Sequence, residues 1–148
     1  AYIAVRRLRN DDTMDKLHQT LRDVLATPVS PELLPFAQIT EDKIGPYELH
    51  DFFLYNFMRC GFTPEKILFL AQHAKFDVEY TLDQLCAWLK IFYTRFFNSQ
   101  FKRDCVPAGP KVGSVSLSPR GDCRMPTEAS KDSLLRRIEK YRNDNVQI

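Results

Sequence analysis

The chain has 148 residues, the ordinary length of one domain built around one hydrophobic core. Apolar residues make up 44% of it and aromatic residues 12%, which excludes a chain that is disordered throughout. No apolar stretch approaches the roughly 20 residues that a membrane-spanning helix needs, so we expect no membrane protein.

The first ten residues carry three arginines and no apolar core of signal-peptide length, so we expect no secretory signal. The four cysteines form no Cys-x-x-Cys pair and therefore indicate neither a zinc site nor a disulfide framework. These features favour a cytoplasmic protein with reduced thiols. Because the chain does not begin with methionine, we expect it to be a piece of a longer protein.

Charge is segregated along the chain although the net charge is only +2. Residues 10–51 hold nine acids and three bases, whereas residues 99–148 hold ten bases and six acids. Such a pattern is typical of two solvated faces that attract one another, and it also occurs at anion and metal sites.

Helical spacing of apolar residues begins after Thr13 and predicts a first helix. That helix cannot continue past Thr27, because the prolines that follow remove backbone donors and restrict their neighbours. We therefore expect residues 27–44 to form a loop. Pro46 suits the first turn of a second helix, which Gly61 ends.

Thr63 and Pro64 begin another short helix, and Thr81 and Gln84 have the spacing of a capping box at the start of a longer one. The pattern predicts a helical region at 13–97, a basic loop at 98–127 and a final helix at 128–142. No stretch alternates as a strand does. The fold class predicted from the residues is therefore mostly α-helical.

Residues 98–127, which we call the basic segment, contain four of the nine prolines and three of the five glycines. Five cations and two acids lie within residues 99–126. Lysines, arginines, serine hydroxyls and backbone amides are groups that bind pyrophosphate, so we expect a functional loop that contacts an anionic ligand. On chemistry alone, a solvated basic loop remains an equal alternative.

Several motifs follow one another in a fixed order. They are Thr-Pro-Val-Ser-Pro-Glu-Leu at 27–33, Ile-Gly-Pro-Tyr-Glu-Leu-His-Asp-Phe at 44–52, Gly-Phe-Thr-Pro-Glu-Lys at 61–66, Ser-Gln-Phe-Lys-Arg at 99–103, Pro-Ala-Gly-Pro-Lys-Val at 107–112 and Ser-Leu-Ser-Pro-Arg-Gly-Asp at 116–122. Together they resemble the C-terminal part of the glutamine-dependent NAD synthetases. The resemblance covers residues 20–140 approximately.

This resemblance implies a reaction in which ATP adenylates the nicotinate carboxylate of deamido-NAD and ammonia then displaces AMP to give NAD. Family members also carry a nitrilase-like glutaminase and a Ser-Gly-Gly-x-Asp-Ser phosphate loop, and this sequence has neither. We therefore expect the C-terminal portion of an α/β, adenine nucleotide hydrolase-like synthetase domain that is inactive alone. The implied partners are deamido-NAD, ATP with Mg²⁺, the remainder of the synthetase with its glutaminase and a second copy of the chain.

The resemblance also implies site residues. Lys102 matches the lysine that contacts deamido-NAD, with Phe101 and Arg103 beside it. Thr27 matches a threonine that touches ATP, and Glu32 matches a glutamate that binds Mg²⁺. The alternatives are a surface lysine at position 102 and an acid at a helix start at position 32.

The sequence departs from the family at Cys123, where tryptophan is common, and at Asp104 and Cys105. A different class of function, a helical nucleic-acid-binding module, would use the basic segment on phosphates and Phe97 or Phe101 on bases. The acidic residues between positions 10 and 51 argue against that alternative, so we expect no nucleic acid and no membrane among the partners.

Overall fold

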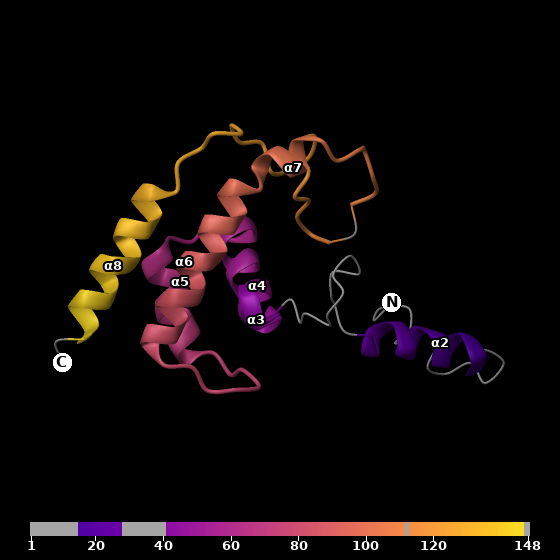
Figure 1. The fold of residues 1–148 in the computed structure, drawn as a ribbon, viewed down its shortest axis with the longest axis horizontal. Coiled ribbons are helices and arrows are strands. Elements are labelled where there is room, and N and C mark those ends of the chain that lie inside the picture. The colour runs from indigo at the N-terminus through magenta and orange to yellow at the C-terminus, as the bar shows by residue number, and fades with distance from the viewer. Residues whose placement is uncertain (1–14, 28–40, 112, 147–148) are drawn as a thin grey trace. The chain divides into compact units, whose positions relative to one another are not determined.

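The computed structural model describes residues 15–27, 41–111 and 113–146 (Figure 1). The chain divides into two units, residues 1–43 and 44–148, which we describe separately. All regular elements in the described ranges are helices, and no strand occurs among them. They are α2 (Asp15–Ala26), α3 (Glu41–Ile44), α4 (Tyr47–Leu54), the π-helix η2 (Tyr55–Arg59), α5 (Pro64–His73), α6 (Leu82–Asn98), α7 (Gln100–Asp104) and α8 (Asp132–Val146).

Helix α2 confirms the first predicted helix and ends at Ala26, before the prolines. The predicted loop at 27–44 is wrong at its end, because residues 41–44 form the short helix α3. Lys43 in its last turn complements the helix dipole, which is a helix signal that the proline-rich context concealed. The region between α2 and α3 lies outside the described residues.

Helix α4 begins one residue later than predicted, because Pro46 is its N-cap and the Pro46 carbonyl accepts hydrogen bonds from two amides of the first turn. The helix then continues as η2, in which the side-chain amide of Asn56 donates to the Phe52 carbonyl at 2.8 Å. The predicted stop at Gly61 is confirmed, since Gly61 has a φ of +63° that an L side chain rarely adopts.

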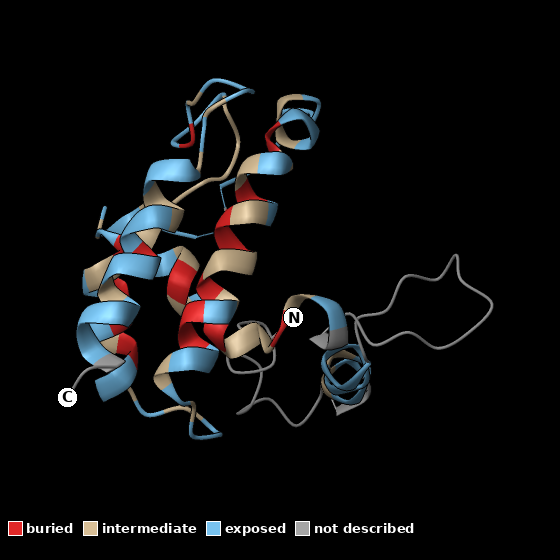
Figure 2. Cartoon of the chain, turned by 60° about the vertical axis from the view of Figure 1, so that its left-hand side comes forward, coloured by how far each residue is buried: buried red, intermediate tan, exposed pale blue. Residues whose placement is uncertain are grey.

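The core of the second unit lies between α4, α5, α6 and α8, whose buried residues face one another (Figure 2). Aromatic rings fill much of it, and the Phe57 ring lies 5.2 Å from Tyr93 and 5.5 Å from Phe96, centroid to centroid, in edge-on contacts. Most of the aromatic residues of α4 and α6 are therefore core residues. Tyr55 is an exception, with 58% of its surface exposed.

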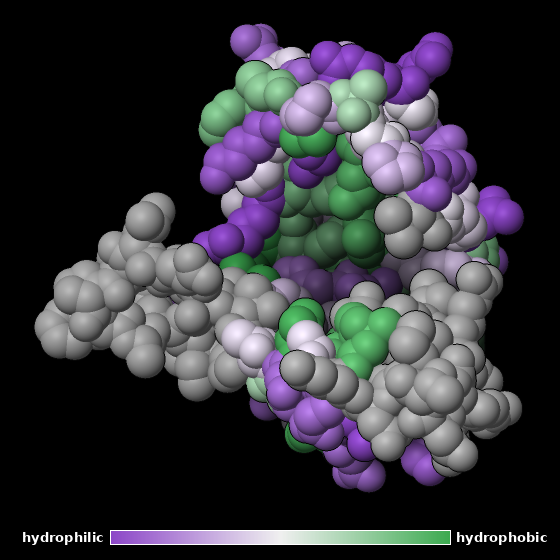
Figure 3. All heavy atoms as spheres, turned by 90° about the vertical axis from the view of Figure 1, so that its right-hand side faces the viewer, coloured by the Kyte–Doolittle hydropathy of each residue, from purple (hydrophilic) through white to green (hydrophobic). Residues whose placement is uncertain are grey.

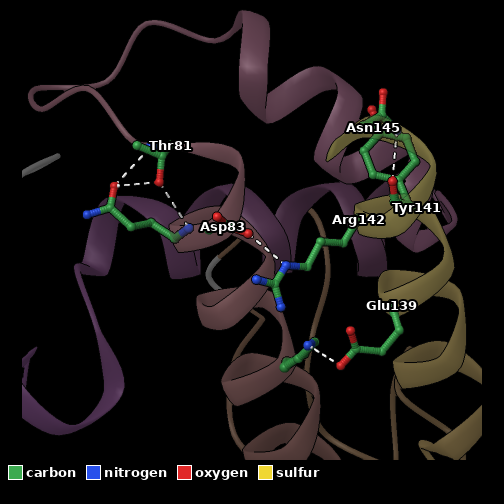
Figure 4. Close-up of polar contacts among 8 residues, drawn as sticks. Thr81, Asp83, Glu139, Tyr141, Arg142 and Asn145 are labelled. Atoms are coloured by element: carbon green, nitrogen blue, oxygen red, sulfur yellow. Dashed lines mark hydrogen bonds and ion pairs between the residues drawn. The ribbon is translucent and has the colours of Figure 1, made fainter. Parts of the chain in front are cut away.

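Helix α6 starts at the predicted capping box. The backbone N–H of Gln84 donates to the Thr81 hydroxyl, and the backbone N–H of Thr81 donates to the side-chain oxygen of Gln84 at 2.9 Å (Figure 4). The two reciprocal bonds satisfy backbone donors that the first turn of a helix leaves unpaired.

Helix α8 runs from Asp132 to Val146 rather than from 128 to 142. It starts later because residues 127 and 128 form a turn and the Ser130 hydroxyl accepts from the Asp132 amide. Ile138 is fully buried against the core, and polar pairs surround it. Arg142 lies 2.7 Å from Asp83, and Lys90 pairs with Glu139 (Figure 4). Arg137 lies 2.6 Å from Glu65.

The basic segment is not a plain loop. Its first residues form helix α7, directly after α6, and residues 119–122 form a turn (Figure 1). Apolar spacing did not reveal α7 because its buried residue is a glutamine.

Two glycines with positive φ allow a matched test of the packing of Gly45 against Trp88. At Gly45, with φ +95°, an added Cβ would lie 2.5 Å from the Trp88 ring, whereas at Gly61 nothing lies within 4 Å of it. We expect Gly61→Ala to lower the free energy of unfolding by about 1–2 kcal/mol through backbone strain alone. Gly45→Ala should lower it by roughly a further 1–3 kcal/mol through overlap with the ring.

Urea unfolding followed by the fluorescence of the single tryptophan measures both variants. Equal losses of stability would contradict the close approach of Gly45 to Trp88.

Candidate functional site

Helix α7 presents two different faces. Its residues spaced three and four apart, Gln100, Arg103 and Asp104, lie on one side, and Phe101 and Lys102 lie on the other. Gln100 is fully buried, whereas Phe101 has 54% of its surface exposed and Lys102 is exposed. The three residues predicted to contact deamido-NAD are therefore divided between two faces of one helix.

The inward face is a hydrogen-bonded cluster that we call the α7 latch, formed by Gln100, Arg103 and Asp104. The Gln100 Oε1 atom accepts from Arg103 Nε at 3.0 Å and from Arg103 Nη2 at 2.7 Å. The Gln100 Nε2 atom donates to Asp104 Oδ1 at 3.0 Å and to the Met125 carbonyl at 3.4 Å. The buried amide thus has partners for both its oxygen and its nitrogen.

Arg103 also contacts the end of α6. Its guanidinium carbon lies 4.1 Å from the centroid of the Phe96 ring, and its Nη2 atom donates to the Phe96 carbonyl. Burial raises the pKa of the neighbouring Cys123 thiol, and Arg103 opposes that rise by charge and by a hydrogen bond. The Arg103 side chain is therefore bound to the scaffold at several points.

The latch also joins the two ends of the basic segment, because the Thr127 hydroxyl donates to Asp104 Oδ2. Asp104 therefore accepts hydrogen bonds from both α7 and the end of the basic segment.

Asp122 organises the middle of the basic segment, and the sequence analysis did not select it. Its Oδ2 atom lies 2.7 Å from Lys111 Nζ and accepts from the Ser116 amide at 2.7 Å. The nearby Arg120 donates to the Val106 carbonyl. A single acid among the cations between positions 105 and 126 was the signal that could have identified Asp122.

Three of the five cations of the basic segment bind other groups of the chain. Arg103, Lys111 and Arg120 donate to groups of the chain itself, so they neutralise or cross-link the loop. Within the described residues, the side chains of Lys102 and Arg124 form no hydrogen bond or ion pair. The Lys102 Nζ atom lies 5.9 Å from the centroid of the Phe101 ring, at the outer limit of a cation–π contact.

Two adjoining hollows lie beside α7, and both are lined by Asp51, Leu54 and Leu117. One has a volume of about 270 Å³ and reaches Phe96 and Arg103, and the other has a volume of about 370 Å³. Figure 3 shows a hollow of hydrophobic surface framed by hydrophilic residues on this face. Lys102 lines neither of these two hollows, and its side chain is exposed.

The other two predicted site residues, Thr27 and Glu32, belong to the first unit of the chain. Thr27 is exposed after α2, and its hydroxyl donates to the Asp23 carbonyl at 2.8 Å. Glu32 lies outside the described residues. Among the residues that the structure does describe, no group of three or more histidine, cysteine or acidic side chains could hold a metal ion.

The contacts of Asp122 predict a pH dependence. The hydrogen bond from Lys111 and then that from the Ser116 amide hold the pKa of the Asp122 carboxyl below its ordinary value. A lowered pKa in the folded state means that these contacts are complete above the ordinary aspartate pKa and are lost as the pH falls through the lowered one. We expect the amide resonance of Ser116 to titrate with a midpoint below the ordinary aspartate pKa.

NMR measurement of that resonance against pH tests the expectation. Lys111→Met should move the midpoint upward because it removes the ammonium. A midpoint at or above the ordinary value in the unmodified chain would show that the pair with Lys111 does not form.

Comparison with known proteins relates this arrangement to one class of enzyme. The chain is 41% identical over 147 residues to glutamine-dependent NAD(+) synthetases of Mycobacterium tuberculosis and Mycobacterium bovis. It is 40% identical over 148 residues to that of Mycobacterium leprae. Each match covers 85% of this chain and 22% of the relative.

No protein-family model matches the chain, and no solved structure matches it significantly. The chain spans about a fifth of the length of the relatives (22%), as the resemblance to one part of a synthetase predicted. The resemblance drawn from the ordered motifs is therefore confirmed, and over most of its length this chain corresponds to a partial region of glutamine-dependent NAD(+) synthetases.

Proposed function

We propose that this chain supplies a contact surface for deamido-NAD within an ATP-dependent synthetase that makes NAD with ammonia from glutamine. The observation that carries the proposal is the outward face of α7, where the exposed Lys102 side chain forms no hydrogen bond or ion pair within the described residues and lies beside the exposed Phe101 ring. An ammonium binds an anionic substrate group as a mobile point charge, and an exposed ring covers a planar group of the same ligand.

The proposed chemistry begins with adenylation of the nicotinate carboxylate by ATP, after which ammonia displaces AMP. Lys102 would hold an anionic part of deamido-NAD while the reacting carboxylate is presented elsewhere in the synthetase. Because this chain has no Gly-Gly phosphate loop to hold ATP, we propose that it is inactive alone. The helices would then pack on an α/β nucleotide-binding domain supplied by the remainder of the synthetase.

Thr27 and Glu32 keep their proposed roles as contacts for ATP and Mg²⁺ on the strength of the motif at 27–33 alone. A carboxylate is a suitable ligand for a hard divalent cation, which would neutralise phosphate charge. No candidate metal cluster occurs in the described ranges, and Glu32 lies outside them.

Pairing with a second copy and a cytoplasmic location also remain proposals. Exposed aromatic residues such as Tyr55 and Phe69 would suit an interface. All four cysteines are free thiols, in keeping with a reducing compartment. No helix in the described part of the chain is long and apolar enough to cross a membrane.

The distribution of cations favours the synthetase over a nucleic-acid-binding module. Three of the five cations of the basic segment are bonded within the chain, which leaves few to follow a phosphate backbone. A dinucleotide needs only a few charged contacts, as the outward face of α7 offers.

Replacement of Lys102 tests the proposal in a full-length synthetase that carries this sequence. Lys102→Ala removes a charge-assisted hydrogen bond of on the order of 1.5–3 kcal/mol, so we expect the KM for deamido-NAD to rise roughly tenfold to a hundredfold. Glutamine hydrolysis should be largely unaffected. Lys102→Arg should restore binding only in part, because a guanidinium fork is not equivalent to a point charge.

Lys140→Ala is the matched control, since Lys140 is also an exposed lysine on a helix, α8. Steady-state kinetics and the melting temperature are measured for each variant. If Lys102→Ala and Lys140→Ala gave the same KM for deamido-NAD, Lys102 would be a surface lysine and the proposal would fail.

A further inference from the structure

The amide of Gln100 is the most completely enclosed polar group of the site. The side chain has no exposed surface, yet every bond it makes is to a residue of the basic segment itself. A buried amide without partners is costly, so Gln100 imposes one arrangement on the groups around it.

Helix α7 needs such an anchor because it has only five residues. The amides of Lys102 and Arg103 both donate to the Ser99 carbonyl, at 3.1 and 3.4 Å. One turn of helix is not stable by its own hydrogen bonds, because nucleation is unfavourable. Side-chain contacts must therefore decide which way the turn faces.

The latch fixes that direction. When Gln100 lies inward and holds Arg103 on the Phe96 ring, helical spacing leaves Phe101 and Lys102 on the outward side. A rotation of α7 that turned Lys102 inward would withdraw Gln100 from its partners.

From this geometry we infer that Gln100 is a positioning residue for Lys102, with Arg103 as its partner in the latch rather than as a second contact for the substrate. The inference rests on the proposed function, since it assigns Gln100 a role only through the lysine that would bind deamido-NAD. Gln100 itself touches no substrate.

An exchange of two side chains tests the inference in the full-length synthetase. Gln100→Glu replaces the donor Nε2 by an oxygen that faces the Asp104 carboxylate and the Met125 carbonyl, so the latch is repelled open. Adding Asp104→Asn restores the donor and acceptor between positions 100 and 104 in reversed positions, and only the longer bond to the Met125 carbonyl stays lost. The Thr127 hydroxyl can still donate to the side-chain oxygen that remains at position 104.

We expect Gln100→Glu to raise the KM for deamido-NAD by about fivefold or more and the exchanged pair to return it to within about twofold of the parent. In a Lys102→Ala background, Gln100→Glu should change the KM by less than about twofold, because the lysine it positions is already absent. Gln72→Glu is the matched control, since Gln72 uses only its side-chain oxygen in its bond with Tyr141 on α8.

Two further measurements keep the test decisive. Melting temperatures identify a variant that fails to fold, in which case Arg103→Lys takes its place, because it keeps the charge and loses the two-atom fork that Gln100 accepts. Arg103→Lys should also raise the KM for deamido-NAD.

The outcomes separate the inference from the proposed function. If Lys102→Ala raises the KM and folded latch variants do not, Gln100 does not position the lysine. Full additivity of Gln100→Glu with Lys102→Ala, or no recovery in the exchanged pair, would also overturn the inference. If Lys102→Ala has no effect, the proposed function itself is wrong.

Discussion

The arrangement of the site depends on one constraint, which is that the buried amide of Gln100 must keep hydrogen-bond partners. Its oxygen is bonded to Arg103, and its nitrogen is bonded to Asp104 and to the Met125 carbonyl. Through these partners it connects the end of α6, the single turn of α7 and the far end of the basic segment. The outward position of Lys102 follows from the same bonds.

A second consequence concerns charge. A count of cations suggests a loop that offers five positive groups to a ligand, but most of them have partners in the chain. Arg103 lies on Phe96 and Lys111 pairs with Asp122. Because these cations bond to groups of the chain itself, the proposed contact of α7 with an anionic ligand would depend on Lys102.

The sequence predicted the helices whose signals are local. Thr81 and Gln84 satisfy a capping box within four residues, and Gly61 ends η2 through its own φ angle, so spacing alone was sufficient. The start of α8 was placed at residue 128, four residues before the helix begins at Asp132, because apolar spacing does not locate the first turn of a helix. Helix α3 was missed because prolines dominated its context.

The site was harder to predict because its contacts join residues far apart in the chain. A run of cations does not reveal that Asp122 lies against Lys111, or that Gln100 reaches Met125. The resemblance to a synthetase led us to propose Lys102, Phe101 and Arg103 together, because a sequence motif does not show which of its residues share a helix face. The division of these residues between two faces of α7 is visible only in the three-dimensional structure.

Side-chain modification of the chain, followed by mass spectrometry, tests most directly whether α7 has these two faces. Acetylation reports on lysines and phenylglyoxal on arginines. The structure predicts rapid acetylation of Lys102 compared with Lys90, which pairs with Glu139, and slow modification of Arg103 compared with the exposed Arg124. If Arg103 reacted as fast as Arg124, or Lys102 as slowly as Lys90, the latch and the outward face of α7 would not exist as described.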